Sequence, residues 1–114
     1  MTMSAETTVD TDLDGLAAEL SAGALVTDRD VIESYSSDKA LFCPVGTASA
    51  LVRAADVDDV VAVMRFATAH RIPVVTQGAR TGLSGAANAT DGALLLNVAK
   101  LNAIVDIDEV NQTC

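Results

Sequence analysis

Apolar residues recur at helical spacing in two short stretches near the start of the chain. The first stretch follows Asp12, a suitable helix cap, and stops before Gly23, a residue that commonly ends helices. The second begins at Thr27 or Asp28. The apolar faces comprise Leu13, Leu16, Ala17 and Leu20 in the first helix and Val31, Ile32 and Tyr35 in the second.

A third and stronger helical pattern follows Asp56. Asp56 is the predicted cap, Asp59 occupies the capping-box position, and the helix is expected to end near His70 and Arg71, whose donor groups suit a helix C-terminus. We expect one apolar face to pack on the core. Its members are Val57, Val60, Val61, Met64, Ala67 and Thr68.

Four other runs are apolar without helical spacing and predict strands. Because their apolar residues are largely consecutive, the later ones are expected to be buried on both faces, as in a parallel sheet. Residues Asp108 to Asn111 predict a turn. The runs are Ala48 to Ala54, Ile72 to Thr76 opened by Pro73, Gly92 to Val98, and Ala103 to Ile107.

The order of these elements predicts an α+β fold with a small, buried, mostly parallel sheet packed with helices. Residues 1–12 predict a disordered tail, 13–35 the N-terminal helices, and 36–114 the main folded unit. Within that unit, residues 36–47 have no periodicity and contain Pro44 and Gly46, which predicts a surface loop. A chain of 114 residues has material for one small domain.

The net charge of -9 excludes several kinds of partner. The seven basic residues are scattered along the chain, so no basic patch is expected to attract nucleic acid or an anionic membrane. There is no apolar run of the roughly 20 residues that a membrane-spanning helix requires. The N-terminal residues lack the pattern of a secretion signal. We expect a cytoplasmic protein, peripheral to a membrane at most through partners.

The cysteines, the histidine and the acidic residues show no pattern of a catalytic or metal-binding site. Cys43 and Cys114 lack metal-ligand spacing and are interpreted as incidental thiols, and His70, the only histidine, as a helix-end residue. The acids Asp58 and Asp59 are interpreted as solvated helix ends, like Asp106 and Asp108 at strand ends. No metal site and no catalytic residue are predicted.

A glycine-rich loop is the exception. Gly78, Gly82 and Gly85 fall within eight residues directly after a predicted strand. Glycine permits positive φ and close approach of another molecule, and successive backbone N–H groups in such a loop can form an anion site. Arg80 adds a positive charge, and its side chain is expected either to contact a phosphate or to lie in solvent. Thr81 and Ser84 add hydroxyl donors.

The spacing excludes two common phosphate loops. The dinucleotide fingerprint G-x-G-x-x-G does not match, and a P-loop needs a Gly-Lys-Ser/Thr sequence, whereas no lysine lies between Lys39 and Lys100. Spacing alone leaves two interpretations open: a phosphate or pyrophosphate site, or a small-residue connection between two buried strands.

The wider sequence resembles a known family. Residues 73–75, the loop 77–85, and residues 94–97 and 101–108 are similar to the PCMH-type FAD-binding domain of the vanillyl-alcohol oxidase superfamily. The similar subgroup is FAD-linked oxidase type 4, which contains D-lactate dehydrogenases and glycolate oxidase subunits. Tyr35 and Asp38 resemble an upstream Tyr-x-x-Asp pattern of that family.

The resemblance implies that the chain is the N-terminal first lobe of the FAD-binding domain, with main-chain amides of the loop on the FAD pyrophosphate. Some branches of the family tether the flavin to a histidine in this loop, and the absence of a histidine here implies non-covalent FAD. Many relatives have Gly in place of Arg80 and Pro in place of Ala54. The implied cofactor-binding residues are Gln77, Gly78, Ala79, Arg80, Thr81, Gly82, Leu83, Ser84 and Gly85.

The complete protein is then expected to oxidise a small 2-hydroxy acid of the D-lactate or glycolate type, with its catalytic residues beyond Cys114. The chain by itself is not expected to be catalytic. Two alternatives remain: a non-catalytic module that binds phosphate or nucleotide through the same loop, and a degenerate fragment of the enzyme.

Overall fold

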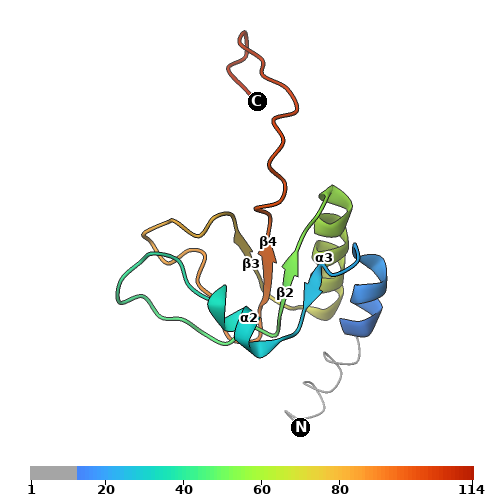
Figure 1. Ribbon diagram of the computed structural model, residues 1–114, viewed down its shortest axis with the longest axis vertical. Coiled ribbons are helices and arrows are strands. Elements are labelled where there is room, and N and C mark those ends of the chain that lie inside the picture. The colour runs from blue at the N-terminus through green and yellow to red at the C-terminus, as the bar shows by residue number, and fades with distance from the viewer. Residues whose placement is uncertain (1–12) are drawn as a thin grey trace.

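A four-stranded sheet forms the middle layer of the protein (Figure 1). The computed structural model describes residues 13–114. The strand order is β1-β2-β4-β3; β1 is antiparallel to β2, and the other neighbours are parallel. This confirms the predicted α+β fold with a mostly parallel sheet. The strands are β1 (Leu25–Val26), β2 (Ala50–Arg53), β3 (Val74–Gln77) and β4 (Leu94–Asn97).

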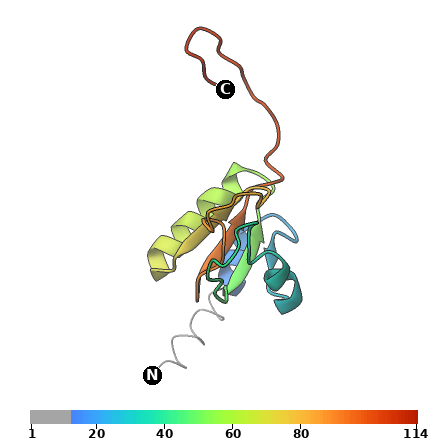
Figure 2. The same ribbon diagram turned by 90° about the vertical axis from the view of Figure 1, so that its left-hand side faces the viewer.

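Helices cover both faces of the sheet (Figure 2). The helix α3 (Val57–His70) and a helical segment over residues 13–19 pack on one face, and α2 (Arg29–Ser34) lies on the other. Side chains alternate between faces along a strand, so Val52 contacts the α3 side whereas Leu51 contacts the α2 side. Burial on both faces explains the continuous apolar sequences of β2 and β4, and it confirms the prediction made for β4.

The two N-terminal helices form as predicted. Asp28 caps α2, because its Oδ1 accepts a hydrogen bond of 2.9 Å from the backbone N–H of Asp30. Leu16 is buried in the 13–19 segment, although Ala17, predicted on the same face, is exposed. The predicted cap at Asp12 and the predicted tail over residues 1–12 lie outside the described residues. Between the helices, β1 pairs with β2, which the sequence pattern did not indicate.

The helix α3 has the predicted limits but a different buried face. Its buried residues are Asp59, Ala62, Val63 and Ala67. Of the predicted face, Ala67 is buried and Val60 packs against the core, but the other four residues are in solvent. Val57 is 67% exposed and Met64 44% exposed, and Val61 and Thr68 are exposed too. The prediction was wrong for Val57, Val61, Met64 and Thr68 because α3 carries apolar residues on most of its circumference. Helical periodicity alone therefore does not select the face that contacts the sheet.

The N-terminus of α3 contains a buried carboxylate. Asp56 caps the helix as predicted, with its Oδ1 accepting a 3.0 Å bond from the backbone N–H of Asp59. Asp59 is buried, however, and its carboxylate accepts bonds of 2.8 Å from the N–H groups of Ser21 and Ala55. The interpretation of Asp59 as a solvated acid was therefore wrong. Burial raises the pKa of Asp59, but these hydrogen bonds outweigh it and hold the pKa below its ordinary value.

Two other predictions need correction. β3 is an edge strand with Thr76 exposed, so it is not buried on both faces. Residues 103–107 form no strand, and Val105 is 95% exposed, because no neighbouring strand lies beside them in the described part of the chain. The turn predicted from Asp108 to Asn111 is present, and a short antiparallel bridge joins Asp108 to Thr113.

No helix within residues 13–114 is both long enough and apolar enough to span a lipid bilayer.

Candidate functional site

A row of polar side chains lies at the carboxyl ends of the three parallel strands. Arg53 is in register with Asn97, which is in register with Gln77. Residues in register on parallel strands point to the same face, here the face covered by α2. The carboxyl ends of parallel strands are the usual ligand-binding edge of α/β sheets. The glycine loop leaves the sheet at this edge, directly after Gln77.

The Gln77 side chain fastens the loop at both of its ends. Its Nε2 donates to the carbonyl of Tyr35 at 2.6 Å and to that of Ala87 at 2.9 Å. Asn97 Nδ2 donates to Gln77 Oε1 at 3.3 Å and to the carbonyl of Gly78 at 3.2 Å. Both side chains are buried, and every buried polar side-chain atom in residues 13–114 has a partner. The hydrogen bonds of the Gln77 side chain are thus made within the protein.

The segment 36–47 supports the other side of the loop. The Lys39 N–H donates to the carbonyl of Gly82 at 3.0 Å. The buried Asn88 accepts from the N–H of Asp38 at 2.7 Å and donates to the carbonyl of Pro44 at 3.1 Å. The segment is a loop, as predicted, but it contributes a wall of the site. The side-chain roles of Asn88 and Asn97 were not predicted from the sequence. The signal that could have indicated them is a polar residue next to apolar residues that are buried.

These contacts occupy four carbonyls of the loop and leave its amides available. The carbonyl oxygens of Gly78, Gly82, Gly85 and Ala87 accept hydrogen bonds from the protein. In contrast, none of the backbone N–H groups of residues 78–87 donates to an acceptor within the described chain. Exposed N–H groups in succession are suited to binding an anion.

The three glycines differ in what surrounds them. A Cβ on Gly78 would meet nothing within 4 Å, and one on Gly82 would meet only Asp38 Oδ2 at 3.8 Å. Gly85 has a φ of +81°, and its Cβ would lie 3.0 Å from the Cβ of Cys43. The fold therefore requires glycine at position 85, whereas positions 78 and 82 border open space.

Arg80 fastens the middle of the loop to α2. Its backbone is left-handed, with a φ of 58°. Its Nη1 donates to the carbonyls of Ser34 at 2.8 Å and Ser37 at 3.3 Å, and its guanidinium carbon lies 4.6 Å from the centroid of the Tyr35 ring. Such stacking is a cation–π interaction. The guanidinium is consequently bound to the protein rather than free in solvent.

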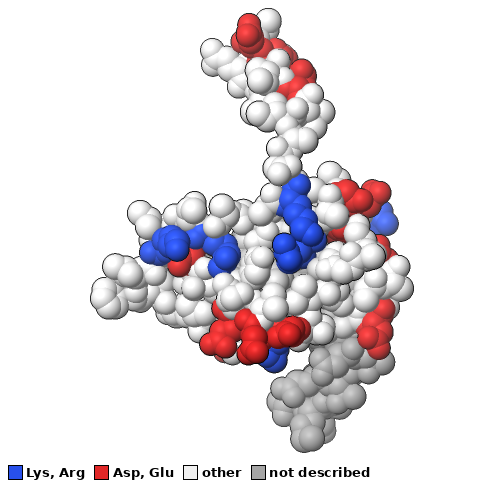
Figure 3. Space-filling model, in the orientation of Figure 1, with Lys and Arg blue, Asp and Glu red and all other residues white. Residues whose placement is uncertain are grey.

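Basic side chains are concentrated near this edge despite the acidic sequence. Figure 3 shows two groups of Lys and Arg side chains towards the arrowhead ends of the strands, and an acidic group at the opposite end of that face. Arg53, at the end of β2, has its guanidinium carbon 5.8 Å from the same Tyr35 ring that Arg80 contacts. The scattered basic residues of the sequence are thus partly brought together by the fold.

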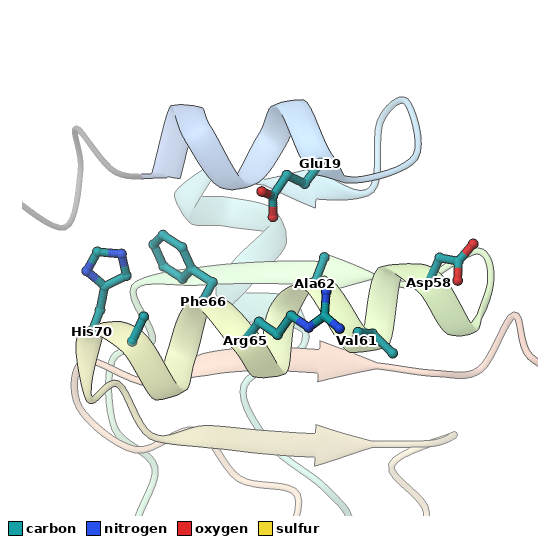
Figure 4. A pocket seen from close by; sticks show the side chains of 8 residues that line it. Glu19, Asp58, Val61, Ala62, Arg65, Phe66 and His70 are labelled. Carbon is teal, nitrogen blue, oxygen red and sulfur yellow. The ribbon is translucent and has the colours of Figure 1, made fainter.

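A second recess lies on the other side of the sheet, between the 13–19 segment and α3 (Figure 4). Glu19 points into it from the first helix, and Asp58, Arg65 and His70 line it from α3. No group of three or more residues in the described range is arranged to hold a metal ion. This recess is separate from the glycine loop, and the structure gives it no link to that site.

Comparison with protein families identifies the domain. A family model described as an FAD binding domain matches residues 48–114, which is more than half of the chain. A D-2-hydroxyglutarate dehydrogenase of Stutzerimonas stutzeri (strain A1501) is 33% identical over 102 residues, covering 89% of this chain and 22% of the relative.

Two further relatives have related names. The D-lactate dehydrogenase of Anaerostipes hadrus is 28% identical over 93 residues, covering 82% of this chain and 20% of that protein. The glycolate oxidase subunit GlcD of Bacillus subtilis (strain 168) is 30% identical over 92 residues, covering 81% and 18%. The chain therefore spans about a fifth of the length of these relatives.

Solved structures share the fold. p-Cresol methylhydroxylase with substrate bound superposes with a TM-score of 0.70 at 25% identity, over 88% of this chain and 20% of that one. 4-Ethylphenol oxidase from Gulosibacter chungangensis, in its isoeugenol complex, gives 0.72 at 18% identity, over 90% and 20%. The chain belongs to the FAD binding domain family of the FAD-linked oxidoreductases and has the PCMH-type fold.

Proposed function

We propose that the loop from Gln77 to Gly85 binds the pyrophosphate of FAD through main-chain amides. The observation that carries the proposal is the run of N–H groups over residues 78–87 without an acceptor in the described chain, beside carbonyls that are fastened to the protein. Such a loop presents donors already held in place, so binding a phosphate costs little ordering.

The residues of the loop have different parts in this proposal. Gln77 closes the loop through its side chain, and Gly78, Ala79, Thr81 and Gly82 supply N–H groups where small side chains leave room for the ligand. Arg80 contributes its N–H while its side chain holds the loop to α2. The rest of the set is Leu83, Ser84 and Gly85, which also contribute N–H groups, with a hydroxyl from Ser84.

FAD is held without a covalent bond in this proposal, because the loop from Gln77 to Asn88 contains no histidine to which the flavin could be tethered. When bound, FAD supplies the hydride acceptor for an oxidation. We infer that the whole protein oxidises a small 2-hydroxy acid, supported by relatives named as D-2-hydroxyglutarate and D-lactate dehydrogenases and as a glycolate oxidase subunit. The described residues hold the cofactor rather than the substrate.

NMR titration of the ¹⁵N-labelled 114-residue chain tests the loop. FAD, ADP and inorganic pyrophosphate should each shift the amide signals of residues 78–87, because all three present phosphate oxygens. Riboflavin, which lacks phosphate, should not shift them. Gly82→Ala should weaken binding, whereas Gly15→Ala, which also adds a methyl group in open space but on the first helix, should leave it unchanged.

A folded chain whose loop amides stay unshifted at millimolar FAD, ADP and pyrophosphate would contradict the proposal. Shifts caused equally well by all three ligands at equal affinity would favour a general phosphate-binding module instead of an FAD site.

The substrate class requires the longer protein. Produced with its downstream coding sequence, it should carry a flavin absorption spectrum that is bleached under anaerobic conditions by a D-2-hydroxy acid such as D-lactate, or by glycolate. A flavin-loaded protein that none of these acids reduces would remove the 2-hydroxy acid from the proposal and leave the FAD loop untouched.

A further inference from the structure

Arg53 occupies a distinctive place next to the loop. It is the last residue of β2, in one row with Asn97 of β4 and Gln77 of β3, on the sheet face that α2 covers. Neighbouring strands lie about 4.8 Å apart, so the backbone of Arg53 is about two such spacings from the point where the loop begins. The Arg53 side chain therefore shares the carboxyl edge of the sheet with the loop amides.

The guanidinium groups of Arg53 and Arg80 both lie near the ring of Tyr35. The two guanidinium carbons lie 5.8 Å and 4.6 Å from the same ring centroid, so they are separated by no more than the sum of those distances. Like charges are unfavourable at short range unless an anion lies between or beside them. Two positive charges near one ring favour a negative ligand beside them.

The two arginines differ in how far their donors are used. Arg80 donates to the carbonyls of Ser34 and Ser37. Arg53 is half-buried, and its backbone N–H donates to the carbonyl of Ala24. The contact with the Tyr35 ring is the only interaction of its guanidinium within the described chain, where no carboxylate or carbonyl accepts from that group. The ring positions the guanidinium of Arg53 and leaves its N–H donors available.

We propose that Arg53 is a second phosphate contact, donating from its guanidinium to a non-bridging oxygen of the pyrophosphate held by the glycine loop. The inference rests on the proposed FAD site. Guanidinium matches phosphate with two parallel hydrogen bonds and carries a full positive charge, whereas loop amides carry only partial charges. In a chain of net charge -9, a local cation offsets the repulsion of an anionic ligand.

The affinity for ADP, measured by amide shifts in the labelled chain, tests the contact. Arg53→Gln should weaken ADP binding about tenfold or more, the usual loss for one charge-assisted hydrogen bond. Arg53→Lys, which keeps the charge and loses the planar fork, should give an intermediate affinity. Arg65→Gln is the matched control, because it removes the same charge from an exposed residue of α3 on the other side of the sheet.

A direct measurement covers the case in which Arg53→Gln fails to fold. In the wild-type chain, the Nε–Hε signal of Arg53 should move on addition of inorganic pyrophosphate, and this signal is identified by its loss in Arg53→Lys. If the loop amides shift while Arg53→Gln binds ADP as tightly as wild type, or while the Nε–Hε signal stays fixed, the Arg53 contact is wrong and the FAD loop stands. If the wild-type loop amides do not shift at all, both proposals fall.

Discussion

The glycines of the loop differ in whether contacts within the protein explain why each residue is glycine. Gly85 has a left-handed backbone and packs against Cys43, so its lack of a side chain is explained within the protein. No such contact or φ value accounts for glycine at position 78. In the proposed function, glycine at position 78 leaves room for the FAD pyrophosphate to approach the backbone.

The glycines yield a prediction about stability and binding together. Gly78→Ala should leave the melting temperature unchanged or slightly higher, because alanine restricts the unfolded chain and meets no atom in the folded one. It should nevertheless weaken ADP binding. Gly85→Ala should destabilise the chain by about 1–2 kcal/mol or more, since alanine there is strained and crowded by Cys43. Thermal unfolding followed by circular dichroism, with ADP titration, measures both effects. Equal loss of stability in the two variants would contradict this division.

Asp59 yields a prediction about pH. Its pKa is lower in the folded chain than the ordinary value of about 3.9, so the stabilisation it provides is fully present above that value and is lost as the pH falls through the folded-state pKa. Asp59→Asn should lower the free energy of unfolding at pH 7 by about 1–3 kcal/mol, because a buried N–H loses its acceptor. The difference from wild type should shrink as the pH is lowered further and further below that ordinary value.

Urea unfolding at pH 7 and at low pH provides the measurement for Asp59. Asp58→Asn is the control, since Asp58 lies in the same helical turn but is exposed. A loss at Asp58 as large as that at Asp59 would show that charge at the helix N-terminus, rather than the buried hydrogen bonds, is responsible.

At the scale of elements, α3 illustrates the limit of periodicity. Asp56 and Arg71 bound the helix as the sequence predicts, because capping is decided by local hydrogen bonds. The buried face was mispredicted because Val57, Val61 and Met64 are as apolar as the residues that face the sheet. Which of these faces is covered depends on the sheet and the first helix, which are distant in sequence.

A pair of valines on α3 tests the assignment of the face. Val63 is fully buried, so Val63→Ala should cost about 2 kcal/mol of unfolding free energy through lost burial and an unfilled cavity. Val61 is 39% exposed, and Val61→Ala should cost less than half as much. Chemical denaturation of both variants compares them, and a larger cost at Val61 would restore the face predicted from periodicity.

At the scale of the whole molecule, the end of the chain stands apart from the body. Residues after Lys100 extend away from the sheet (Figure 1), and Val105 and Val110 are 95% and 92% exposed. The terminal turn is local: Asp108 accepts from the N–H groups of Val110 and Asn111, and the hydrogen bonds from Asn111 lower the pKa of Asp108. None of these contacts connects the turn to the sheet.

This separation predicts that the body folds without the extended end. A chain that ends at Asn102 should have nearly the same melting temperature as the 114-residue chain, because residues 103–114 bury almost no surface. In the longer chain, the backbone amides of residues 103–107 should exchange with solvent at close to unprotected rates. A clear loss of stability on truncation would show that these residues pack on the body.

The sequence by itself determined the features that depend on neighbours along the chain. These are the caps at Asp28 and Asp56, the buried strand β4, the terminal turn and the glycine loop after Gln77. The resemblance carried by that loop and its flanking strands correctly indicated the family.

Only the tertiary structure decided which surfaces meet. It selected the buried face of α3, made β3 an edge strand, buried Asp59, and placed Arg53 and Arg80 on one ring. It also paired four of the loop carbonyls with the protein and left the amides available. Each of these depends on contacts between residues far apart in sequence, which no local pattern of apolar and polar positions encodes.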